Sequence, residues 1–122
     1  MNLLINNKRF NSCLVTYTYK GCEKYLNRFK KTIHEQTFKN FDVLIFNDKG
    51  NLKNFKINHS HRIINNSKSI FKNRVESLKY ILKMNYKKIH YLDIDDVMAP
   101  DRIKKIDKAL DKHNLVFCNI YL

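Results

Sequence analysis

The sequence predicts an α/β fold with a mostly parallel sheet and helices on both of its faces. Short apolar runs alternate with segments at helical spacing, which is the pattern of proteins that alternate strands and helices. Polar clusters follow several of the apolar runs, as expected where strands end in loops. Right-handed crossovers between successive strands would make these strands largely parallel.

One domain is expected to span residues 1–122, since this length supports a single hydrophobic core. Hydrophobic residues make up 43% of the chain, and the sequence contains no internal repeats. No run of about 18 apolar residues is present to cross a bilayer. Residues 1–10 are too polar and too short for a signal peptide. We therefore expect a cytoplasmic protein.

The first half of the chain predicts two strands separated by a helix. Residues 13–17 (CLVTY) form a β-rich run. One helical face follows, made by Cys22, Tyr25, Leu26, Phe29 and Ile33. Residues 41–46 (FDVLIF) form the second strand, and the turn-forming residues 47–51 (NDKGN) place polar groups at its carboxyl end.

A third strand, a second helix and a fourth strand follow. Residues 61–64 predict a short strand, and residues 89–92 predict another. Between them, an amphipathic helix is marked by four apolar residues at helical spacing: Phe71, Val75, Leu78 and Leu82.

The end of the chain predicts a third helix and a last strand. Pro100 stands in the first turn of a helix over residues 101–112. Its inward face carries Ile103, Ile106 and Leu110. Residues 115–118 (LVFC) form the last predicted strand.

Three carboxylates are crowded directly after the fourth predicted strand, at Asp93, Asp95 and Asp96. Such a cluster must repel itself or hold a cation, and ligands of open α/β sheets bind outside the carboxyl ends of the strands. Hard oxygen donors suit Mg²⁺ or Mn²⁺. The alternative is that these acids only complement the dipole of the helix that follows.

Loops after the first, second and fourth strands should converge on one edge of the sheet. They bring Thr18 and Tyr19 from the first loop and Asp48 from the second to the acidic cluster. Two plainer interpretations stay open, because Asp48 also suits a simple turn and tyrosines at strand ends usually pack.

Four segments together resemble the nucleotide-binding half of the GT-A glycosyltransferases, most closely family 2. Residues 15–20 (VTYTYK) look like the opening strand and its Thr-Tyr-Asn-Arg turn. Residues 36–43 (QTFKNFDV) are similar to the segment that leads into the second strand. Residues 47–50 (NDKG) stand where the family has Asp-Asp-Gly-Ser. Residues 92–96 (LDIDD), with Pro100 downstream, match the Leu-Asp-x-Asp-Asp motif and its proline.

The resemblance implies a Rossmann-like GT-A half that binds a nucleotide-diphosphate sugar, with a UDP-sugar favoured. It implies Mn²⁺ or Mg²⁺ at a DxD motif and transfer to a glycan or lipid-linked acceptor, as in bacterial surface polysaccharide synthesis. A metal would stabilise the charge that develops on the diphosphate leaving group.

The resemblance also implies roles for individual residues. Nucleotide-binding roles fall on Thr18, Tyr19, Asp48, Arg74 and Asp95, and metal-binding roles fall on Asp96 and Asp95. Asp96 is the preferred metal ligand, whereas Asp95 fits either the ribose or a water on the metal. Arg74 and Lys20 would donate to phosphate oxygens, although Arg74 also fits an ordinary solvated helix position.

The sequence departs from the family pattern at two positions of the second loop. Asn47 replaces the first of two acids, and Lys49 occupies a small-residue position, so nucleotide affinity is expected to be lower. Family members continue into an acceptor-binding half, which supplies the catalytic base that deprotonates the acceptor. No residue here is assigned that role. We therefore predict a donor-binding half with little or no turnover by itself.

The net charge of +13 allows other partners, because basic proteins attract nucleic acid, anionic membranes and phosphorylated ligands. The lysines are scattered over every predicted helix, which favours a solvated surface, with peripheral membrane attachment as the alternative. A basic module that binds nucleic acid or other anions without catalysis would need clustered charge and exposed aromatic residues. We expect no nucleic-acid partner.

Two further interpretations are less favoured. Residues 93–97 (DIDDV) also resemble the nucleophile motif of haloacid-dehalogenase-type phosphatases. That motif lies on the first strand of its family, however, and too few residues follow it here. Cys13, Cys22 and Cys118 are widely spaced and odd in number, which predicts free thiols and no disulfide or zinc site.

Overall fold

Four parallel strands form one sheet, in the order β3-β2-β1-β4. The computed structural model describes residues 8–66 and 69–117. The strands are β1 (Ser12–Tyr19), β2 (Phe41–Asp48), β3 (His61–Asn65) and β4 (Lys88–Tyr91). The four strands therefore occur where the sequence predicted them, and the parallel α/β sheet is confirmed.

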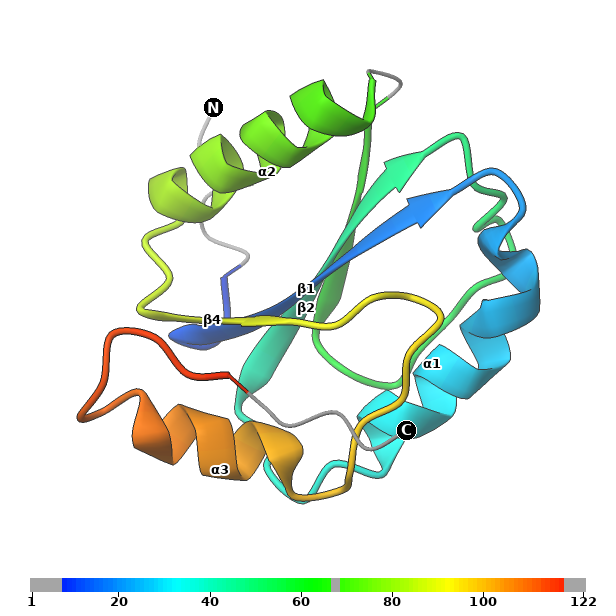
Figure 1. Ribbon diagram of the computed structural model, residues 1–122. Helices are drawn as coiled ribbons and strands as arrows, with labels where there is room; N and C mark the ends of the chain where they lie inside the picture. Colours follow the sequence, from blue (N-terminus) through cyan, green and yellow to red (C-terminus); the bar gives the residue numbers. More distant parts are fainter. Residues whose placement is uncertain (1–7, 67–68, 118–122) are drawn as a thin grey trace.

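Helices cover both faces of this sheet, as predicted. A short 3₁₀ helix, η2 (Cys22–Tyr25), leads into α1 (Leu26–His34), and α2 (Ile70–Lys83) connects β3 to β4. The last helix of the described chain is α3 (Arg102–Ala109). Figure 1 shows α2 alone on one face, with α1 and α3 on the other. Among the described residues, no helix has both the length and the apolar character that crossing a membrane requires.

The face covered by α1 and α3 is packed with apolar side chains. Phe29 and Ile33 of α1 and Ile103 of α3 are fully buried against alternate residues of the central strands, including Leu14 and Val43. Alternation of side chains along β1 and β2 gives each face its own set. The inward face of the first helix is confirmed, and its Tyr25 is half-buried.

The second helix occurs where it was predicted, but its four marker residues do not form the face that packs on the sheet. The buried residues of α2 are Asn73, Ser77 and Ile81. Three of the four predicted positions are exposed, at 76% for Phe71, 48% for Leu78 and 77% for Leu82, and Val75 is half-buried. The stripe at helical spacing thus faces away from the sheet.

Polar groups on the sheet explain this orientation. The Tyr17 hydroxyl of β1 lies 2.7 Å from the Ser77 hydroxyl, which in turn donates to the Arg74 carbonyl at 2.6 Å. A tyrosine hydroxyl that is partly buried usually has a hydrogen-bond partner, and the Ser77 face of α2 provides one for Tyr17. Ile81 then fills the apolar remainder beside Phe46.

The last predicted strand is also wrong over its described part. Residues 115–117 are not in a strand, and the side chains of Leu115 and Phe117 are 70% and 86% exposed. Cys118 lies outside the described residues. An apolar run becomes a strand only where it pairs with another strand, and periodicity alone does not show the pairing.

The third helix differs from the prediction only in its length, and two of the cysteines are free thiols. The third helix begins at Arg102 and is shorter than the predicted residues 101–112, with Ile103 buried. Cys13 and Cys22 are buried free thiols, as predicted. Burial, with a smaller contribution from the charge of Asp42, raises the pKa of Cys13 to about 12.

Candidate functional site

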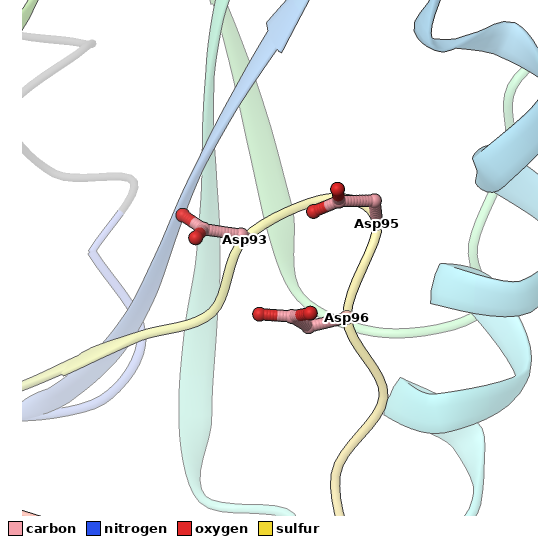
Figure 2. Close-up of side chains that lie close together, drawn as sticks. All are labelled: Asp93, Asp95 and Asp96. Atoms are coloured by element: carbon pink, nitrogen blue, oxygen red, sulfur yellow. The ribbon is translucent and has the colours of Figure 1, made fainter. Parts of the chain in front are cut away.

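Three carboxylates gather on the loop that follows β4. Asp93, Asp95 and Asp96 are exposed, and one oxygen from each lies within 4.8 Å of the others. Their side chains leave the loop in the same general direction (Figure 2). The Asp96 amide donates to the Asp93 carbonyl at 3.0 Å and closes the turn that brings them together. Three hard oxygen donors this close suit a divalent cation such as Mg²⁺ or Mn²⁺.

Buried apolar neighbours fix the direction of these carboxylates. Leu92, Ile94 and Met98 are 4%, 2% and 8% exposed and belong to the core beneath the loop. Because these three side chains point inward, the aspartates between them must point outward. The local sequence thus specifies a loop with an apolar underside and an acidic outer side.

Thr32 of α1 and Gln36, which follows this helix, hold the end of the loop through side-chain hydrogen bonds. The Met98 amide donates to the Thr32 hydroxyl at 3.1 Å. The buried Gln36 amide donates to the Ala99 carbonyl at 2.8 Å and accepts from the Ile103 amide at 3.2 Å. Gln36 therefore connects the acidic loop to the first turn of α3. Gln36 is the first residue of the segment 36–43, one of the four segments that resemble the glycosyltransferase family. These hydrogen bonds therefore give that glutamine a structural role.

Arg28 of α1 is a site residue that the sequence analysis missed. Its guanidinium donates to the backbone carbonyl of Asp95. The same group lies over the Tyr25 ring, with Arg28 Cζ 5.6 Å from the ring centre. This contact brings a positive charge to the acidic loop from 67 positions earlier in the chain. No local motif signals it, because only the packing of α1 beside the loop creates the contact.

The ends of β1 and β2 supply the second part of the site. Tyr19 is paired in register with Asp48, so both lie at the carboxyl edge of the sheet. Tyr19 is 43% exposed. Its pKa is raised by desolvation and then by the negative charge of Asp95, which relates this tyrosine to the acidic loop. Asp48 is half-buried, and its buried Oδ1 has no hydrogen-bond partner among the described residues.

The side chains of Thr18 and Asn47 point to the opposite face of the sheet from Tyr19 and Asp48, and they stabilise the turn after β2. Thr18 is buried and donates to Asn47 Oδ1 at 2.8 Å, and the Gly50 amide donates to the same oxygen at 2.9 Å. Asn47 Nδ2 donates to the Gly50 carbonyl at 3.0 Å and to Asn65 Oδ1 at 2.9 Å. An aspartate has no hydrogen to donate. The asparagine that departs from the family pattern is therefore suited to this turn.

Gly50 is required by the same turn. A Cβ at this position would lie 2.5 Å from Asn47 Oδ1 and 3.0 Å from the Tyr19 carbonyl. The preceding residue, Lys49, has a φ of 63°, which is in the left-handed region that favours glycine. The turn after β2 is thus tightly built around Asn47.

Arg74 is held against the sheet by an aromatic ring. Its guanidinium lies 3.8 Å from the ring centre of Tyr17, within the range of a favourable cation–π contact. Tyr17 also contacts the ring of Phe46 at 5.9 Å between centres.

The structure therefore groups the predicted site residues in three places: the acidic loop, the Tyr19 and Asp48 edge, and Arg74 on Tyr17. The Thr18 side chain points into the core.

Comparisons with known proteins give matches only at the level of structure. No protein-family model matches the chain, and no curated protein matches it. Among solved structures, S. aureus TarS 1-349 in complex with UDP-GlcNAc is similar, with a TM-score of 0.63, 18% identity and 84% of this chain covered. S. aureus TarS has a TM-score of 0.59 and 21% identity, and TarS 1-349 has 0.59 and 20%, both over 84% of this chain.

These matches establish the fold. TarS is a GT-A-type glycosyltransferase, and the present chain has the Rossmann-like fold of part of it, as the four motif segments predicted. The chain spans 32%, 20% and 33% of the three solved chains, respectively.

Proposed function

We propose that this chain is the donor-binding part of a glycosyltransferase that uses a nucleotide-diphosphate sugar, with a UDP-sugar as the favoured donor. The observation that carries the proposal is the group of three carboxylates at the carboxyl edge of the sheet, within 4.8 Å of one another. The shared fold with TarS, whose structure was determined with UDP-GlcNAc, supports the choice of donor.

In this proposal the acidic loop binds a divalent cation and the strand ends bind the nucleotide. Asp96 and Asp95 hold Mn²⁺ or Mg²⁺, and the bound ion supplies positive charge that stabilises the diphosphate leaving group. The unpartnered Asp48 Oδ1 accepts an N–H group of the base. Tyr19 borders the nucleotide, Asp95 is placed to contact the ribose or a metal-bound water, and Thr18 supports the edge from beneath.

Arg74 and Arg28 add positive charge to the same region. Arg74 lies against Tyr17, where a modest side-chain movement would direct its guanidinium to phosphate oxygens. Arg28 already contacts the backbone of the acidic loop and holds Asp95 in place. These arginines would offset the repulsion between the carboxylates and the diphosphate.

We assign no catalytic base to the described residues. An inverting transfer needs a carboxylate that takes the proton of the acceptor hydroxyl as it attacks the sugar, and Asp95 and Asp96 already have proposed roles at the metal. The chain by itself is therefore expected to bind donor with little or no turnover. The glycan or lipid-linked acceptor belongs to the same proposal.

Calorimetric titration of the purified chain with UDP tests this function. We expect binding in Mn²⁺, weaker binding of GDP, and no binding in EDTA. Asp96→Asn should weaken the metal-dependent binding of UDP by at least about tenfold, because it removes a charged ligand. Asp111→Asn makes the same chemical change at an exposed position after α3 and should leave binding unchanged.

Two results would contradict the proposal. One is UDP binding that is equal in Mn²⁺ and EDTA, which would show that the carboxylates hold no functional ion. The other is the absence of nucleotide binding by a chain whose circular dichroism shows a folded α/β protein.

A further inference from the structure

The outer face of α2 is an apolar stripe that no described residue covers. Phe71 and Leu82 are 76% and 77% exposed, and Leu78 between them is 48% exposed. These residues extend over most of the 14-residue helix, which is about 20 Å long at 1.5 Å per residue. An apolar stripe of this length on the surface marks an interaction site.

Lysines follow one side of this stripe. Lys72, Lys79 and Lys83 are exposed and recur at helical spacing beside Phe71 and Leu82. Lys79 has an ion pair with Glu76 at 3.6 Å, but both side chains are largely exposed, so this pair is weak. A helix with an apolar stripe and a basic side is typical of segments that lie in the interface of a membrane.

A cavity beside the lysines adds room for a polar group. It has a volume of about 330 Å³ and lies between α2 and the end of β3. Lys79 and Lys83 line it from the helix, and Asn65 and Asn66 line it from the strand end. The lining is completed by Glu76, Tyr80, Phe46 and Ile64. The lysines and asparagines can donate hydrogen bonds to phosphate oxygens, and they stand beside one carboxylate.

Charge favours an anionic lipid surface over a second copy of this chain. The chain carries a net charge of +13, and pairing two α2 faces would bring two sets of lysines together. An anionic bilayer instead takes up the apolar side chains and attracts the lysines at the level of the headgroups.

We propose that the outer face of α2 docks this protein on an anionic lipid bilayer. The α2 helix begins at the edge of the sheet where β1 and β2 end (Figure 1). Docking through Phe71 and Leu82 would therefore hold the edge that carries Asp48 and the acidic loop near the membrane. This inference goes beyond donor binding and does not depend on it.

Vesicle sedimentation without nucleotide or metal tests the proposal. Binding is expected to phosphatidylcholine vesicles that contain phosphatidylglycerol, to decrease with added salt, and to be absent with phosphatidylcholine alone. The double variant Phe71→Ser with Leu82→Ser should lose binding by at least about tenfold. Its control is Leu115→Ser with Phe117→Ser, which removes equally exposed apolar side chains outside α2 and should bind like the parent.

Two triple variants with the same net charge distinguish binding through the surface of α2 from attraction by the overall charge of the protein. Lys72, Lys79 and Lys83 changed to Gln should lower vesicle affinity by roughly fivefold per lysine. The same change at Lys104, Lys108 and Lys112, which are exposed on α3 and after it, keeps the net charge equal and should have a much smaller effect.

Three results would overturn the proposal. Equal losses in the two lysine sets would show attraction by overall charge alone. Parent-like binding of the Phe71 and Leu82 variant would exclude the stripe. A dimer in sedimentation equilibrium that dissociates in this variant, without vesicle binding by the parent, would identify a second copy as the occupant.

Discussion

The two helical layers of this protein use their polar and apolar side chains in opposite ways. On the side of α1 and α3, apolar residues such as Phe29 and Ile103 face the sheet. Thr32 of α1 and Gln36, which follows this helix, hold the acidic loop. On the other side, α2 turns Ser77 toward the sheet and leaves Phe71 exposed.

This difference shows that the surface facing a helix decides which of its sides is buried. The α2 side of β1 presents the hydroxyl of Tyr17, which contacts Ser77 at 2.7 Å. The other side of the sheet presents Leu14 and Val43, whose side chains are apolar and form no hydrogen bonds. A polar group left unpaired in the core costs more than an exposed leucine. The α2 stripe is therefore free for another partner.

The largest expected effect comes from exchanging one phenylalanine in each layer for alanine. Phe29→Ala removes a fully buried ring of α1 and should lower the free energy of unfolding by about 3–5 kcal/mol. Phe71→Ala removes an exposed ring of α2 and should change it by no more than about 0.5 kcal/mol. Urea denaturation measures both values. Equal losses would mean that α2 packs through its outer face.

An intermediate effect is expected at the hydrogen bond between Gln36, which follows α1, and the end of the acidic loop. Gln36→Glu removes the donor to the Ala99 carbonyl within a buried site and should destabilise the fold by about 1–3 kcal/mol. UDP binding should weaken as well, because the end of the acidic loop loses the hydrogen bond from Gln36. Glu35→Gln, the reverse change at the adjacent exposed residue, is the control. A variant with parent stability would show that this contact is dispensable.

The smallest effect concerns pH and the buried His90 beneath α3. Its Nε2 lies 3.0 Å from Asp107 Oδ1, which also accepts from the Ser12 hydroxyl. Burial lowers the pKa of His90, and the charges of Arg102 and Lys88 add to this, although Asp107 acts in the opposite direction. Its buried Nδ1 has no partner in the described part of the chain. The folded protein therefore favours the neutral ring.

The direction of the pH dependence follows from this lowered pKa. As the pH falls below the ordinary histidine value of about 6.5, the unfolded chain binds a proton at His90 before the folded chain does. Stability should therefore decrease as the pH falls through this range. His90→Gln should make the decrease shallower, whereas His113→Gln, at an exposed position, should not. Thermal unfolding between pH 7 and pH 5 gives the comparison, and identical curves for His90→Gln and the parent would contradict it.

The sequence alone was sufficient for the order of elements from the first strand to the third helix and for the position of the acidic cluster. Strands rich in β-branched and aromatic residues, and the face of α1, follow from local periodicity. The motif at residues 92–96 placed three carboxylates after a strand, and parallel connections then required them to lie at the carboxyl edge. These features depend on neighbours in the sequence, which is why they were predictable.

Only the tertiary structure decided the features that depend on contacts between distant segments. The outward face of α2 depends on Tyr17, and the contact between Arg28 and the Asp95 carbonyl joins residues 67 positions apart. The suitability of Asn47 depends on Asn65, a residue of the neighbouring strand. Residues 115–117 are apolar but lie outside any strand. Periodicity reports which side chains avoid water, whereas the partner that removes them from water is chosen by the fold as a whole.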